Sequence, residues 1–66
     1  MTGTLPRPGA EIDVVVTSSK PFGLFVETEP GVPGLVRGAG AEVGTVVRVR
    51  VTEYDAVESR FSATPA

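Results

Sequence analysis

The chain has 66 residues, eight carboxylates against six Lys and Arg for a net charge of −2, and neither cysteine nor histidine. This length allows a single domain, which buries only about 60% of the surface that its unfolded chain exposes. The composition excludes disulfides, thiolate or imidazole metal ligands and a histidine general base. We therefore expect one thinly stable domain that folds on apolar burial, without a metal or a cofactor.

No segment is typical of a membrane span or an export signal. Every apolar run is far shorter than the roughly 20 residues that a membrane-spanning helix needs. The segment MTGTLPRPG lacks the basic region and the apolar stretch of a secretory signal. Because the absence of cysteine also fits a reducing compartment, we expect a cytoplasmic protein without a membrane partner.

Five segments are rich in β-branched residues and are bounded by Gly, Pro, Asp or Ser, as strands usually are. They span residues 11–18, 23–27, 32–36, 45–52 and 60–63. Eight glycines and six prolines interrupt every candidate helix, so we expect little or no helix. Closure into a barrel would remove the open strand edges. The predicted fold is all-β, a small five-stranded barrel over residues 9–63, with flexible tails at 1–8 and 64–66.

Alternation along the strands predicts which side chains face the core. The apolar residues that share the inner face are Ile12, Val14, Val16, Leu24, Val26, Val47, Val49 and Val51. Arg48 and Arg50 then lie on the solvent-exposed face of their strand.

Phe22 and Phe25 lie three residues apart around Gly23, a spacing that strict alternation would send to opposite faces. A bulge or turn at Gly23 would reset the alternation, and glycine tolerates the dihedral angles that such a bulge needs. Such a bulge or turn would bring both rings to one outer face. The alternative is that either ring belongs to the core of a barrel that has few other large side chains.

Six elements in sequence order resemble the RNA-binding domain named after ribosomal protein S-one, a five-stranded oligonucleotide-binding (OB) barrel. They are Gly9, Phe22-Gly23-Leu24-Phe25-Val26, Gly34-Leu35-Val36, Gly44, the alternating Val47, Val49 and Val51, and Asp55 with Arg60. The resemblance covers residues 9–64. It implies an OB barrel in which the connection between strands three and four, residues 38–43, is shorter than the family's helical segment. We expect this end of the barrel to be less well covered.

The resemblance also implies a non-catalytic module that binds single-stranded RNA, ribosomal or messenger, with a role in translation. The family's RNA-contacting positions correspond here to Phe22, Phe25, Asp55, Arg60 and Arg37, the last standing where the family often has histidine. From the residues themselves we add Lys20, Arg48 and Arg50 as cations that would attract the RNA backbone if they share the same face. One base stacked on an aromatic ring contributes roughly 1 to 3 kcal/mol.

The candidate RNA-binding residues also have purely structural explanations. Arg48 and Arg50 are typical of a solvated face, and Asp55 with Arg60 of an ion pair that closes a loop. The glycine cluster at 31–44 does not match a phosphate-binding loop and precedes no helix. Glu53 and Asp55 resemble paired carboxylates but have no nucleophile or histidine beside them, so we expect no catalytic residue and no enzyme.

The acidic net charge favours a second class of function. An OB-type module that has lost RNA binding would use its exposed Phe and Val side chains, or a strand edge, for a protein partner or for self-association. An OB protein that acts on the ribosome, similar to a translation initiation factor, is a third interpretation.

Overall fold

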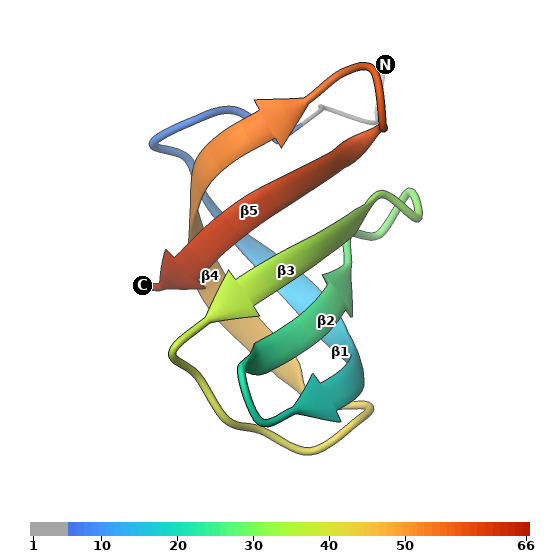
Figure 1. Ribbon diagram of the computed structural model, residues 1–66, viewed down its shortest axis with the longest axis vertical. Coiled ribbons are helices and arrows are strands. Elements are labelled where there is room, and N and C mark those ends of the chain that lie inside the picture. The colour runs from blue at the N-terminus through green and yellow to red at the C-terminus, as the bar shows by residue number, and fades with distance from the viewer. Residues whose placement is uncertain (1–5) are drawn as a thin grey trace.

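The computed structural model describes residues 6–66 as five strands (Figure 1). These are β1 (Glu11–Lys20), β2 (Gly23–Glu27), β3 (Pro33–Arg37), β4 (Val46–Asp55) and β5 (Arg60–Pro65). They close into a barrel in the order β1-β2-β3-β5-β4, in which β3 and β5 pair in parallel and the other neighbours are antiparallel. Residues 6–66 contain no helix, and hence none that could cross a membrane. The predicted fold class, a small OB barrel, is confirmed.

The strands run further than the composition predicts. β1 and β5 each continue for two residues and β4 for three beyond the expected ends. Thr64 and Pro65 pair with Arg50 and Val49, so most of the segment 64–66 belongs to the sheet rather than to a loose tail. Of the other predicted tail, residues 1–5 lie outside the described part of the chain.

The core contains the inward-facing side chains of all five strands. Its buried members are Val14, Val16, Leu24, Val26, Val36, Val49, Val51, Phe61 and Ala63, while Ile12 and Val47 are partly buried against them. The face assignments made from alternation are therefore confirmed. The ring of Phe61 lies directly against Gly34, where the Cβ of any other residue would collide with it.

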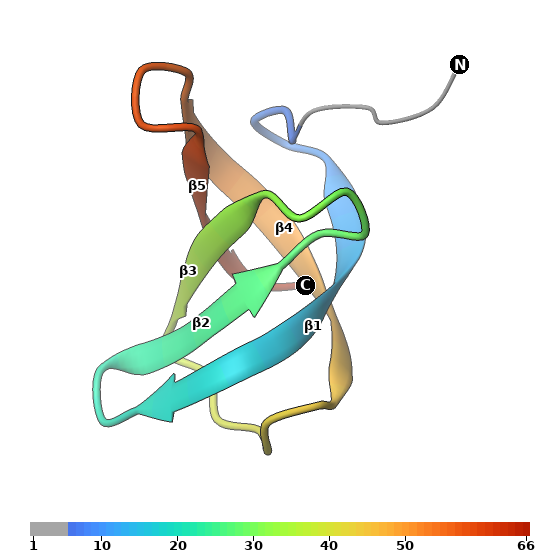
Figure 2. The ribbon, with the colours of Figure 1, turned by 90° about the vertical axis from the view of Figure 1, so that its right-hand side faces the viewer.

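The two ten-residue strands each serve two neighbours. The first half of β1 pairs with β4 and its second half with β2, whereas β4 pairs with β1 and then with β5 (Figures 1 and 2). Each strand has a register shift, at Thr17 within the pairing of β1 with β2 and at Thr52 within the pairing of β4 with β5. A bulge bends and twists a strand, which lets a long strand pass from one side of a small barrel to the other.

The connection 38–45 carries no helix but still covers its end of the barrel. Ala39 and Ala41 are partly buried and pack against the core. Backbone hydrogen bonds join Gly44 N to Val16 O at 2.8 Å and Val16 N to Thr45 O at 2.9 Å. Small side chains and a tie to β1 thus take the place of the longer segment that the resemblance implies.

Candidate nucleic-acid interface

Phe22 and Phe25 both lie on the outer surface, as expected. Phe22 is 60% exposed and Phe25 is 39% exposed. Their ring centroids are 6.0 Å apart and the planes meet at 64°, an edge-to-face arrangement. This separation lies within the range of about 4.5 to 7 Å over which aromatic pairs attract each other.

A turn directly before Gly23 brings the two rings to a shared face. Phe22 occupies a two-residue turn with Pro21, and the pairing of Gly23 with Lys20 and Arg37 on either side is regular. The ring of Phe22 therefore points outward because it belongs to the turn, so of the two expected causes, a bulge or a turn at Gly23, the turn is present and the bulge is not. Gly23 is needed for another reason: its φ is 154°, and a Cβ there would collide with the carbonyl oxygen of Val36.

The bulge that does shape this surface lies in β1. Strict alternation from Val16 would turn Lys20 inward, but the extra residue at Thr17 reverses the phase. Lys20 consequently pairs with Gly23, on the face that Phe25 occupies, and its Nζ lies 6.0 Å from the centroid of the Phe25 ring. This distance is at the limit of a cation–π contact. The sequence contains an indication of this bulge. Strict alternation would place two polar residues, Ser18 and Lys20, in the core.

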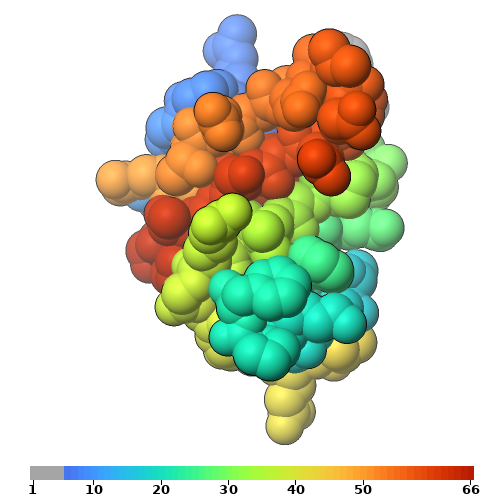
Figure 3. Space-filling view, viewed as in Figure 1, coloured from blue at the N-terminus to red at the C-terminus, as the bar shows by residue number. Residues whose placement is uncertain are grey.

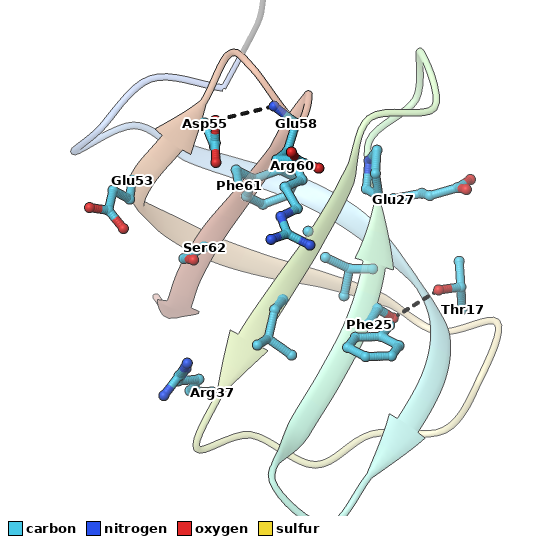
Figure 4. A pocket seen from close by; sticks show the side chains of 14 residues that line it. Thr17, Phe25, Glu27, Arg37, Glu53, Asp55, Glu58, Arg60, Phe61 and Ser62 are labelled. Atoms are coloured by element: carbon cyan, nitrogen blue, oxygen red, sulfur yellow. Dashed lines mark hydrogen bonds between the residues drawn. The ribbon is translucent and has the colours of Figure 1, made fainter.

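A groove begins at Phe25 and crosses β2, β3 and β5 (Figures 3 and 4). The strand register places one outward row along it, with Phe25 opposite Leu35, Leu35 opposite Ser62 and Ser62 opposite Glu53. Leu35 and Ser62 were not among the predicted site residues. Leu35 could have been found, because alternation between the buried Gly34 and Val36 turns it outward.

Arg37 and Arg60 line this groove from β3 and β5. Figure 4 shows the Arg60 side chain between these two strands, with Arg37 further along. Neither arginine forms an ion pair within residues 6–66, where the only two ion pairs are those of Arg48 and Arg50. Both guanidinium groups are therefore available to an incoming acceptor.

Asp55 faces Arg60 across the β4–β5 hairpin, but its carboxylate is used elsewhere. Its Oδ1 accepts a hydrogen bond of 3.0 Å from the backbone N–H of Val57 and another of 3.2 Å from that of Glu58. Figure 4 shows the bond from Glu58. An aspartate that caps a turn in this way orders the loop. The expected loop-closing function is thus present, although it acts through the backbone instead of an ion pair with Arg60.

Arg48 and Arg50 do not line the groove. They lie on the part of β4 that pairs with β1, where Arg48 contacts Asp13 at 3.3 Å and Arg50 contacts Glu11 at 2.8 Å. The hydrogen bond from Arg50, together with its charge, lowers the pKa of the Glu11 carboxyl from its usual value of 4.5. The structure therefore separates these two arginines from Arg37 and Arg60.

The groove has mixed charge. Its lining includes two guanidinium groups and four carboxylates, those of Glu27, Glu53, Asp55 and Glu58. Figure 4 shows the Glu27 and Glu53 side chains pointing outward at opposite sides, so they lie at the rim. Within the described residues, no three acidic side chains are close enough to one another to hold a metal ion. The outward row of the groove contains Phe25 and Leu35, with the Arg60 side chain between β3 and β5 and Arg37 further along.

No known family profile matches this chain, and no curated protein is detectably related to it in sequence. Solved structures do resemble it. The uncharacterised protein MJ1198 of Methanocaldococcus jannaschii superposes with a TM-score of 0.80 at 20% identity, over 91% of this chain and 92% of that chain. GSP13 of Bacillus subtilis gives 0.80 at 22% identity, over 89% of this chain and 55% of that chain.

Another similar structure is a multidomain protein with nucleic acid binding domains from Streptococcus pneumoniae. Its TM-score is 0.75 at 20% identity, over 94% of this chain and 26% of that chain. A chain of the a/eIF2alpha–aDim2p–rRNA complex from Pyrococcus horikoshii gives 0.77 at 16% identity, over 91% of this chain and 44% of that chain. This chain therefore spans about a quarter to about half of three of these four neighbours, and identities this low show a shared fold alone.

Proposed function

We propose that this protein is a non-catalytic module that binds single-stranded RNA in the groove across β2, β3 and β5. Bases stack on Phe25 and Phe22, and Arg37, Arg60 and Lys20 interact with phosphates or base edges. The main support is the edge-to-face pair of exposed rings, whose centroids are 6.0 Å apart, at the end of the groove. The groove also holds two arginines that have no ion-pair partner in residues 6–66.

Stacking should supply more of the affinity than charge does. Every base has a flat face, so a ring platform accepts any sequence, and each stacked base contributes roughly 1 to 3 kcal/mol. The phosphate contribution scales with the number of cations in contact, and within residues 6–66 the cations found on or beside this groove are Arg37, Arg60 and Lys20. The four carboxylates around it reduce the attraction further. We therefore expect modest affinity and a weak dependence on salt.

Two of the similar structures support a nucleic-acid partner. One is described as having nucleic acid binding domains, and another belongs to a complex with rRNA. By this proposal the chain acts in the cytoplasm, on ribosomal or messenger RNA, and performs no chemistry on it.

An NMR titration with short pyrimidine and purine RNAs tests the proposal. Addition of RNA at low salt should shift the backbone amides of Phe22, Phe25, Arg37 and Arg60, and leave those of Arg48 and Arg50 nearly unchanged. Arg48 and Arg50 serve as internal controls because they are equally cationic but lie outside the groove. No shift at low salt would contradict the function, and shifts confined to β1 and β4 would contradict the site.

The excess of carboxylates along the groove favours one alternative, a module that binds a protein instead of RNA. Glu27, Glu53 and Glu58 would then contact a basic peptide, with an apolar side chain against Phe25 and Leu35. A lysine-rich peptide that shifts the groove amides, where RNA does not, would establish this alternative.

A further inference from the structure

A second surface lies on the part of the barrel where β1 pairs with β4, away from the groove. We call it the β1–β4 face and define it by three outward residues of β1, Glu11, Asp13 and Val15, and three of β4, Val46, Arg48 and Arg50. All six are exposed, with Val15 at 42% and Val46 at 62%. In Figure 1 this part of the barrel lies behind β2, β3 and β5.

The charges on this face are sorted by strand. The register pairs Glu11 with Arg50, Asp13 with Arg48 and Val15 with Val46. The outward column of β1 is therefore acidic with a valine at one end, and that of β4 is basic with a valine at the same end. Outward neighbours along a strand are about 6.6 Å apart, and the two columns about 4.8 Å.

This arrangement is self-complementary under a two-fold axis. When two copies meet face to face about an axis parallel to the strands, β1 of one copy lies over β4 of the other at the same height. Asp13 then faces Arg48 of the second copy, Glu11 faces its Arg50, and Val15 faces its Val46. Every carboxylate gains a second guanidinium group, and the four valines meet at one end of the contact.

We propose that the β1–β4 face binds a second copy of this chain and forms a symmetric dimer. Two-fold contacts use the same patch on both partners, as this face requires. The two carboxylates make the face a poor site for RNA, and its two arginines are equally unsuited to a basic partner. The contact is independent of the proposed groove and would leave one groove on each copy.

The dimer should be weak. A stable interface buries about 800 Å² on each partner, whereas the whole described surface measures only 4348 Å² and this face is one part of it. Val43, 62% exposed in the loop before β4, adds apolar surface close to Val46 in the chain. We expect association between about 10 μM and about 1 mM, the range of small and transient contacts.

Charge reversal of one column at a time gives a direct test by sedimentation equilibrium. An all-acid variant carries Arg48→Glu and Arg50→Glu, and an all-base variant carries Glu11→Arg and Asp13→Arg. Each alone should associate at least about tenfold more weakly than the parent, because like charges then face each other. An equal mixture of the two should associate again, since every row becomes complementary.

A four-residue swap of both columns sharpens the test. A chain with all four substitutions should form dimers with itself but not with the parent, because its acidic column would lie over the acidic column of the parent. Circular dichroism checks that each variant folds, and the exposed ion pairs contribute little to folding. A parent that stays monomeric at about 1 mM, variants that associate as well as the parent, or a mixture that does not associate would overturn the proposal. Loss of RNA binding in the all-acid variant, with a parent that is monomeric, would also overturn the proposal. That result would mean that the β1–β4 face binds RNA.

Discussion

The hydroxyl of Thr17 donates a hydrogen bond of 3.1 Å to the carbonyl oxygen of Phe25, the residue that carries one of the two exposed rings. Thr52 makes the corresponding bond, also 3.1 Å, to the carbonyl oxygen of Ser62. Each threonine is the extra residue of a bulge. The two hydrogen bonds therefore link the bulge of β1 to β2 and the bulge of β4 to β5, and both β2 and β5 line the groove.

Replacement of either threonine by valine should lower the stability of the barrel. Valine has the same shape but cannot donate, and a lost hydrogen bond costs about 0.5 to 1.5 kcal/mol, here toward the lower end because both side chains are exposed. Urea unfolding of Thr17→Val and Thr52→Val measures the effect. Thr64→Val is the control, because no side-chain hydrogen bond of Thr64 occurs within residues 6–66. Equal stability of all three variants would show that the bulges do not need these bonds.

Loss of either ring should weaken RNA binding if bases stack on the pair. Phe25→Ala and Phe22→Ala should each reduce affinity by roughly 1 to 3 kcal/mol, or about 5-fold to 150-fold. Fluorescence anisotropy with labelled oligoribonucleotides measures this loss. Val57→Ala, another exposed apolar residue, lies in the β4–β5 turn and should bind like the parent. Full affinity in Phe25→Ala would remove the stacking mechanism.

The salt dependence of RNA binding should separate the arginines. Each phosphate contact with single-stranded nucleic acid contributes a slope of about −0.7 in the logarithm of affinity against the logarithm of salt. Arg37→Gln and Arg60→Gln should each flatten the slope by up to this amount, whereas Arg48→Gln should not. If Arg48→Gln were the only variant with a weaker salt dependence, the phosphate contacts would have to lie on the β1–β4 side of the barrel instead of in the groove.

Replacement of glycine by alanine should lower the free energy of unfolding strongly at Gly23 and Gly34 but only slightly at Gly40. Gly23→Ala combines a strained φ of 154° with a collision against the backbone of Val36, and Gly34→Ala drives a methyl group into the ring of Phe61. We expect each to cost at least about 2 kcal/mol of unfolding free energy. Gly40→Ala has open space and should stay within about 0.5 kcal/mol of the parent. Thermal or urea unfolding compares the three, and a mild effect at Gly23 would show that the turn can adjust.

At acidic pH the ion pair between Glu11 and Arg50 should no longer contribute to the folding stability of the barrel. The pKa of the Glu11 carboxyl is lower in the folded protein than its usual 4.5, so the stabilisation is present above this value and is lost as the pH falls through the lowered pKa. The parent should therefore be more stable than Glu11→Gln at about pH 7, and the difference should shrink toward about pH 2. Urea unfolding at both values gives the comparison. A difference that is independent of pH would show that the charge of Glu11 is not involved.

Alternation along the sequence was enough to predict the five strands and much of the core. Alternation is a local property with a period of two, so Val14, Val16, Val49 and Val51 could be assigned to the interior from their spacing alone. The surface position of Phe22 and Phe25 was one of two interpretations that the sequence allowed, and the turn at Pro21 and Phe22 is what places both rings outside.

How these faces combine depends on contacts between strands that are far apart in the chain. The bulges at Thr17 and Thr52 lie within the pairings of β1 with β2 and of β4 with β5, and they reverse the alternation so that Lys20 and Glu53 face outward. The parallel pairing of β3 with β5 brings Leu35 beside Ser62, residues far apart in the chain. Barrel closure likewise sends Arg37 and Arg48 to different surfaces. These relationships depend on which strands become neighbours, and strand order in a closed barrel is a property of the whole chain.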